Sequence, residues 1–197
     1  SLPTSAGTHR FQWDLRLDGA RMVRDPDLVT WDTKGPMVAS IGKGPMVVPG
    51  DYQVRLTVDG ETHTASFTVK PDPRLEVGHE ALVEQFEFLI EIQDTVSKVN
   101  GLIDKTSALR KQALDWSGAN GSHEIAKAAE SLVEKLDAIR PKLIDVNIWQ
   151  SQLWPSGLHE KFNALFESVD SADYAPPQQA RDVFAKLNDD LQAAENE

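Results

Sequence analysis

The spacing of the apolar residues changes once along this chain, between Val69 and His79, and this change constrains the fold more than any other feature. Before it, apolar side chains recur at every second position, which is typical of half-buried strands. After it they recur at every third or fourth position, the period of an amphipathic helix. The sequence therefore predicts an α+β fold in which an antiparallel sheet precedes a helical bundle, divided as 1–70, a linker at 71–78, and 79–197.

Three strands are predicted in the first 70 residues. Residues 9–17 alternate with apolar side chains at positions 11, 13, 15 and 17, so we expect Trp13 to lie in a core. Residues 52–58 and 62–69 flank Asp59-Gly60, a strong signal for a two-residue hairpin turn. Residues 18–48 are rich in loops, with a further strand placed at 28–31 and short edge segments near residues 37–38 and 46–47. The prolines at 71 and 73 end the sheet.

The predicted bundle is of the up-and-down type, with three to four helices. Its first helix runs from about 79 to 116 and is long enough to project beyond its partners. A second apolar seam runs from 125 to 143, where Pro141 is expected to kink or restart the helix. Two shorter helices follow near 158–169 and 177–194.

Net charge limits the classes of partner. Residues 1–70 hold eight basic and eight acidic residues, so residues 71–197 carry the whole net charge of −11. An acidic bundle repels phosphate backbones, and we therefore expect no nucleic-acid partner. No apolar run approaches the roughly 18 residues that span a bilayer, so no membrane span is predicted. The chain has no cysteine, which excludes disulfides and thiolate metal sites.

No catalytic or metal-binding motif is found. None of the five histidines has a second ligand at metal spacing, and we predict no catalytic residue, no metal and no cofactor, so the chain is not expected to be an enzyme. His79, His123 and His159 each precede a glutamate at a predicted helix start. We expect these three pairs to be exposed in the first turn, where the helix dipole favours the carboxylate.

The five tryptophans are the most informative candidates for binding. Exposed aromatic rings stack on sugars or anchor a protein partner. Trp31 and Trp116 flank predicted loops and are the two candidate binding residues. Trp149 and Trp154 are expected to plug the end of the bundle or the joint between the two parts.

Two segments of the sheet region resemble an Ig-like domain of the flagellar hook-capping type, whose pattern is G-x-N-x-x-x-W-D followed by P-G-x-Y-x-V-x-L. The matching residues are Gly7 to Arg16, with Trp13-Asp14, and Val48 to Gly60, with Pro49-Gly50 and Tyr52. His9 stands where the pattern usually has Asn. The rest of the chain resembles the C-terminal region of large bacterial proteins with an N-terminal sortilin-like, Asp-box (BNR) β-propeller, often labelled glycosyl hydrolases. The pieces that carry this second likeness are 70–74, Gln85-Phe86, 155–158 and 169–173.

The resemblance implies a non-catalytic C-terminal accessory module of a larger exported protein, periplasmic or secreted, whose own propeller is the expected partner. The sheet is then a partial Ig-like β-sandwich, since about seven strands complete one and the family's domain has strands before the Gly7 position. The open edge would pair with a second copy or a partner strand. The alternative is a carbohydrate-binding accessory module, which requires exposed tryptophans.

Overall fold

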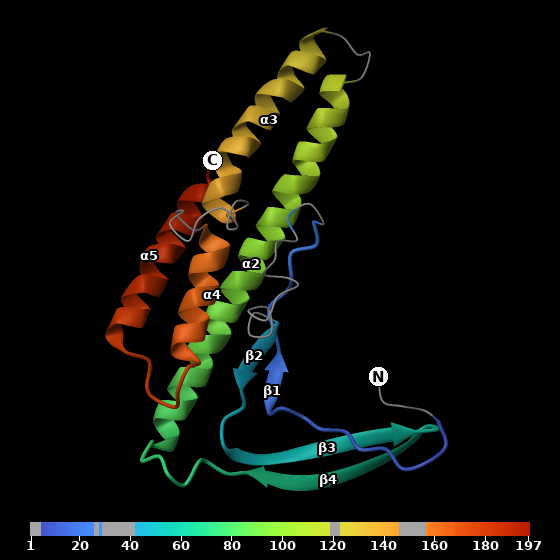
Figure 1. Cartoon of the computed structure of the whole chain (residues 1–197), viewed down its shortest axis with the longest axis vertical. Coiled ribbons are helices and arrows are strands. Elements are labelled where there is room, and N and C mark those ends of the chain that lie inside the picture. The colour runs from blue at the N-terminus through green and yellow to red at the C-terminus, as the bar shows by residue number, and fades with distance from the viewer. Residues whose placement is uncertain (1–4, 26–27, 29–41, 119–122, 146–156) are drawn as a thin grey trace.

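The computed structural model describes residues 5–25, 28, 42–118, 123–145 and 157–197. Two antiparallel strand pairs precede four helices in this part of the chain, which confirms the α+β order (Figure 1). β1 (Arg16–Asp18) pairs with β2 (Lys43–Met46), and β3 (Gly50–Val58) pairs with β4 (Glu61–Val69). The described strands thus form two separate two-stranded sheets, and no Ig-like sandwich is seen among them.

The β3–β4 hairpin forms where the sequence predicts it. Its nine residue pairs run without a bulge from Gly50 opposite Val69 to Val58 opposite Glu61. Asp59 and Gly60 both have positive φ, of 51° and 87°. Positive φ at both central residues is the geometry of a type I′ turn, whose twist matches that of the flanking strands.

The first predicted strand is largely wrong. Only Arg16 and Leu17 of the strand predicted at 9–17 lie in β1, and Leu15 has a positive φ of 62°, outside the extended region. Phe11 and Leu17 are 73% and 40% exposed. The alternating pattern predicted a half-buried strand, but residues 8–14 make no strand ladder in the described structure.

The helices pack as a three-helix bundle at one end and a two-helix hairpin at the other. α2 (His79–Gly118) is a single helix of 40 residues, about 60 Å long. α3 (His123–Leu143) and α4 (Leu158–Val169) lie one after the other along it, both antiparallel to α2, and α5 (Gln178–Glu195) returns beside α4 (Figure 1). The long projecting first helix is confirmed, whereas strict up-and-down alternation is wrong because α4 continues in the direction of α3.

Pro141 neither restarts nor breaks α3, which runs on to Leu143. The proline lacks the N–H that would bond the carbonyl of Asp137, and it stands in the last turn, so only Lys142 and Leu143 follow it in the helix. Leu143 itself is fully buried.

The core is built where α2, α4 and α5 meet. Phe184 of α5 packs edge to face against Phe88 and Phe162, with ring centroids 5.4 and 6.0 Å apart. Gln85 is buried and donates hydrogen bonds from Nε2 to the carbonyls of Val169 and Ala172, at 2.6 and 2.7 Å. It therefore satisfies carbonyl groups that the end of α4 leaves without helical partners.

A segment that precedes the sheet hairpin also belongs to this packing. Val23 and Leu28 are buried in the same core cluster as the helices. The backbone N–H of Arg21 donates to Ser97 Oγ at 3.1 Å, and that of Arg24 donates to Asp104 Oδ1 at 2.8 Å. The sheet region is thus fastened along α2 by residues that the alternating pattern did not single out.

Candidate functional site

The β3–β4 hairpin has one apolar and one polar face, because successive side chains of a strand point to opposite sides. Tyr52, Val54, Leu56 and Val58 share the apolar face with Ala65 and Phe67, which the register places opposite Val54 and Tyr52. The same face carries His63 and Glu61 towards the turn, opposite Leu56 and Val58. The other face carries only charged, amide and hydroxyl side chains: Asp51, Gln53, Arg55, Thr57, Thr62, Thr64, Ser66 and Thr68.

The base of the apolar face is covered by Trp13. Its ring centroid lies 6.2 Å from those of both Tyr52 and Phe67, and these two rings stack 5.9 Å apart. Trp13 Nε1 donates to the carbonyl of Arg16 at 2.8 Å, and the Tyr52 hydroxyl donates to the carbonyl of Val48 at 2.6 Å. The three rings pack into a small cluster, and the polar atoms of Trp13 and Tyr52 are hydrogen-bonded within the chain. Trp13, which was predicted to lie in a core, is half-buried in this cluster.

The distal half of the apolar face is uncovered. Val54, Leu56 and Val58 are 54%, 43% and 50% exposed. These three side chains form an apolar row along β3, bordered on β4 by His63 and Glu61. A two-stranded hairpin is at best marginally stable alone in water, and exposed apolar side chains rimmed by polar residues mark an interaction site. This surface, which we call the distal hairpin face, is the first candidate site.

A groove of about 670 Å³ lies between the base of the hairpin and the bundle. Its apolar lining includes Val69 and Phe86, and its charged lining includes Arg16 and Asp170, whose side chains form an ion pair at 2.8 Å. Partial burial raises the pKa of the Asp170 carboxyl, and the guanidinium of Arg16 opposes that rise. The Arg16 guanidinium also donates to the Gly44 carbonyl at 2.9 Å. The bond to Gly44 lies within the sheet region, and the ion pair with Asp170 links that region to the bundle. The ion pair is therefore best explained as stabilising the contact between the two parts.

A buried polar cluster lies deeper in the bundle, and the sequence did not predict it. His159 is 6% exposed, so its predicted exposed position is wrong. Its Nδ1 lies 2.7 Å from Asn100 Oδ1, and Asn100 Nδ2 donates to the carbonyl of Arg21 at 2.5 Å. Since Asn100 presents its oxygen, Nδ1 carries the proton. Burial lowers the pKa of His159 to about 4.

Glu160, next to this cluster, is also shielded from solvent. Burial is the main cause that raises its pKa to about 7, while backbone N–H groups, including that of Asp145, oppose the rise. The Asp145 N–H lies 3.3 and 3.2 Å from the two carboxyl oxygens. The predicted His–Glu pair at this helix start is therefore inside the protein, whereas His79 and His123 are exposed as expected.

Of the two candidate binding tryptophans, Trp116 alone lies within the described residues. Trp116 is 57% exposed near the end of α2, far along the helix from the β3–β4 hairpin (Figure 1). Trp31, Trp149 and Trp154 lie outside the described residues, as do residues 29–31 of the strand predicted at 28–31 and the edge segment predicted near 37–38. Further exposed apolar residues occur on the projecting part of α2 and α3: Leu109, Leu114, Ile125 and Leu132.

The described residues contain no group of three or more histidine, cysteine, aspartate or glutamate side chains that is arranged to hold a metal ion. None of the described helices is long and apolar enough to cross a membrane. Comparisons with family models, with curated proteins and with solved structures find no match to this chain.

Proposed function

We propose that this chain is a non-catalytic protein-interaction module, in which a helical bundle holds out the β3–β4 hairpin for a partner. The observation that carries the proposal is the distal hairpin face, where Val54, Leu56 and Val58 are each at least 43% exposed. Hydrophobic burial is worth about 25 cal/mol for each Å² removed from water, so covering these side chains favours association. The rigid base that Trp13 forms with Tyr52 and Phe67 positions the uncovered half.

In this proposal the hairpin contributes two strands to an Ig-like sandwich that a protein partner completes. The Pro49-Gly50 and Tyr52 pattern at the start of β3 supports the Ig-like character. By the same resemblance, the module is the C-terminal accessory region of an exported protein, periplasmic or secreted, and one of its partners is that protein's β-propeller.

The test begins with the complete reading frame that contains this chain. If it encodes a β-propeller, the propeller is produced separately and titrated calorimetrically with wild-type chain and with the Val54→Thr/Leu56→Thr variant. We expect binding at least about tenfold weaker for the variant, because two methyl-rich side chains leave the contact. Thr64→Val on the polar face is the matched control and should bind as the wild type does.

Three results would contradict parts of the proposal. A reading frame without a propeller refutes that partner, and equal propeller binding by wild type and the Val54→Thr/Leu56→Thr variant refutes the distal hairpin face as the contact. Turnover of a glycoside by the isolated chain, abolished by a single substitution, would refute its non-catalytic character.

Carbohydrate binding is the second candidate, and the exposure of Trp116 favours it. An aromatic ring that is 57% exposed can stack on a pyranose face. Tryptophan fluorescence of wild type and of Trp116→Ala, titrated with soluble oligosaccharides, tests it. A saturable change lost in the variant supports a sugar site at Trp116, and an identical response in both proteins excludes it.

A further inference from the structure

The outer edge of β3 pairs with no strand among the described residues. A two-residue turn makes Val58 and Glu61 a hydrogen-bonded pair. Along an antiparallel ladder, hydrogen-bonded pairs alternate with pairs that are not hydrogen-bonded to each other. The even-numbered residues of β3 therefore bond to β4, and the odd-numbered ones point their N–H and C=O groups outward. No described residue makes a backbone hydrogen bond to these outward groups.

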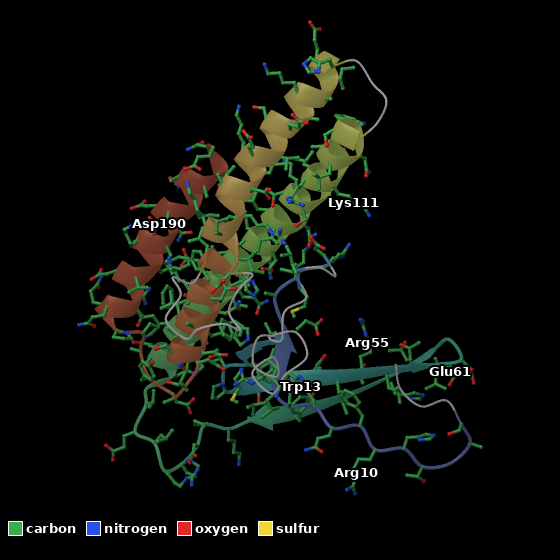
Figure 2. The ribbon with its side chains drawn as sticks, turned by 45° about the horizontal axis from the view of Figure 1, so that its top comes forward. Arg10, Trp13, Arg55, Glu61, Lys111 and Asp190 are labelled. Carbon is green, nitrogen blue, oxygen red and sulfur yellow. The ribbon has the colours of Figure 1, made fainter. Side chains whose placement is uncertain are left out.

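The edge of β3 has few of the features that keep sheet edges from pairing. Native edges are blunted by charged side chains, above all lysine, and by proline or bulges, and the two charged residues of β3, Asp51 and Arg55, are of opposite sign. β3 has neither lysine nor proline among its nine residues, and its ladder with β4 is regular. Asp51, Gln53 and Arg55 are exposed on its polar face. Figure 2 shows Arg55 projecting from β3 on the side opposite Arg10.

The charges of this edge are complementary to a second copy of themselves. An antiparallel pair with a two-fold axis at Gln53 places Asp51 of each copy opposite Arg55 of the other. An axis at Arg55 would instead set two guanidinium groups face to face, and an axis at Val54 would leave both charges opposite uncharged residues. Opposite charges stabilise a cross-strand pair and like charges destabilise it, so the axis at Gln53 is selected.

The apolar face agrees with the same register. With the axis at Gln53, Tyr52 of one copy lies opposite Val54 of the other, on the face that carries the distal hairpin residues. Aromatic and β-branched side chains form favourable cross-strand pairs. Each Val54, now 54% exposed, would be covered by an aromatic ring.

The outer edge of β4 has no charged outward residues that would select one pairing register. Its outward residues are Thr62, Thr64, Ser66 and Thr68, which are uncharged and fix no register by charge. Thr68 moreover donates its hydroxyl to Asp51 Oδ1 at 2.6 Å across the hairpin. This bond engages one oxygen of Asp51 and leaves the other for an arginine.

We propose that two copies of this chain pair antiparallel through β3, with the two-fold axis at Gln53, to form a four-stranded sheet in the order β4-β3-β3-β4. The inference rests on the proposed interaction function and names the partner of the hairpin edge. The partner strand supplies the missing hydrogen bonds, and the Asp51 and Arg55 side chains set the register.

Charge exchange tests the pairing. Sedimentation equilibrium is measured for wild type, Asp51→Arg, Arg55→Asp and the double variant, with circular dichroism to verify folding. Because each single substitution makes two like-charge pairs in the dimer, we expect dissociation constants raised about tenfold or more. The double variant restores both pairs and should dimerise within about threefold of wild type.

Two matched controls isolate the register. Thr62→Asp introduces a charge on the β4 edge opposite Thr57 and not opposite Arg55, and Thr68→Val removes the hydroxyl that Asp51 accepts from. Neither should change the dissociation constant of the dimer. A wild-type chain that stays monomeric into the millimolar range, or a double variant no tighter than the single ones, overturns the proposal.

A cysteine probe gives an independent readout, because the chain has no cysteine of its own. In the proposed register the two Gln53 residues face each other as a hydrogen-bonded pair, with Cα atoms about 5.5 Å apart. That separation lies within the reach of a disulfide. Gln53→Cys should therefore form a covalent dimer under mild oxidation, whereas Thr64→Cys, equally exposed on the polar face, should not.

The outcomes separate this inference from the proposed function. If Gln53→Cys and Thr64→Cys cross-link equally slowly while the propeller still binds through the distal hairpin face, self-pairing is wrong and the interaction function stands. If neither self-pairing nor propeller binding is observed, both are wrong.

Discussion

Glu160→Gln is expected to stabilise the protein at neutral pH, because the substitution replaces a buried carboxyl by its uncharged isostere. Burial raises the pKa of Glu160 from 4.5 to about 7. Between these values the folded chain holds a proton that the unfolded chain has released. The contribution of Glu160 to stability is thus fully present below pH 4.5 and is lost as the pH rises through 7. A pKa shift of this size changes the free energy of unfolding by about 3 kcal/mol over the whole titration.

His159 acts in the opposite direction over nearly the same range. Its pKa falls from 6.5 to about 4 on burial, so the unfolded chain binds the extra proton. Its contribution to stability is present above pH 6.5 and is lost as the pH falls towards 4. Each group changes the free energy of unfolding by up to about 1.4 kcal/mol per pH unit, with opposite sign. Their effects therefore cancel in the wild-type protein between about pH 4.5 and 6.5.

Urea unfolding at pH 4.5, 5.5 and 6.5 separates the two effects. The free energy of unfolding of Glu160→Gln, minus that of the wild type, should rise by about 2 kcal/mol between pH 4.5 and 6.5. The reason is that the variant does not lose stability through ionisation of Glu160. For His159→Gln the same difference in the free energy of unfolding should rise by about 2 kcal/mol as the pH falls from 6.5 to 4.5, because the variant has no histidine to protonate in the unfolded state. Using differences from wild type cancels the titration of all other groups.

Glu130→Gln on the exposed side of α3 is the control, and its difference from wild type should not depend on pH. Differences for Glu160→Gln and His159→Gln that stay constant within about 0.5 kcal/mol across the three pH values would refute the reasoning. They would mean that solvent reaches both groups in the folded protein.

Three further substitutions test the packing by urea unfolding at pH 7. Phe162→Ala removes a fully buried ring and should cost about 4 kcal/mol, with a loss below about 1 kcal/mol showing that the site is not packed as described. Gly157→Ala should cost about 1–3 kcal/mol, since its Cβ would lie 2.6 Å from the backbone nitrogen of Ile144, and an unchanged midpoint would contradict this close approach. Gln85→Met keeps the volume but removes the donor to the carbonyls of Val169 and Ala172, at an expected cost of about 1–3 kcal/mol; a neutral effect would show that water replaces the amide.

The buried polar groups had a faint signal in the sequence. Asn100 follows Val99 in the apolar stripe of the first long helix, and Asn163 and His159 stand one turn apart near Phe162. A polar side chain on the buried side of a helix indicates an internal hydrogen bond, since burial without a partner is costly. The identity of that partner was not predictable, because the carbonyl of Arg21 comes from a segment 79 residues away.

The same separation between local and long-range information explains the strand errors. Residues 9–17 carry the alternating pattern of a strand, yet a strand also needs a neighbour to accept its hydrogen bonds, and periodicity says nothing about which neighbour exists. The hairpin was predictable because both partners and the Asp59-Gly60 turn are contiguous. The distal hairpin face was predicted to be half buried, and only the structure shows that Val54, Leu56 and Val58 lie uncovered.

The sequence by itself determined the order of the elements, the limits of the long helix, the hairpin turn and the acidic charge of the bundle. These properties depend on neighbours within a few positions along the chain. Tertiary structure alone decided that α3 and α4 follow one another along α2, that His159 is buried and Glu160 partly buried, and that no described strand pairs with the outer edge of β3. Burial and pairing are fixed by contacts between distant segments, whose free energies no local pattern records.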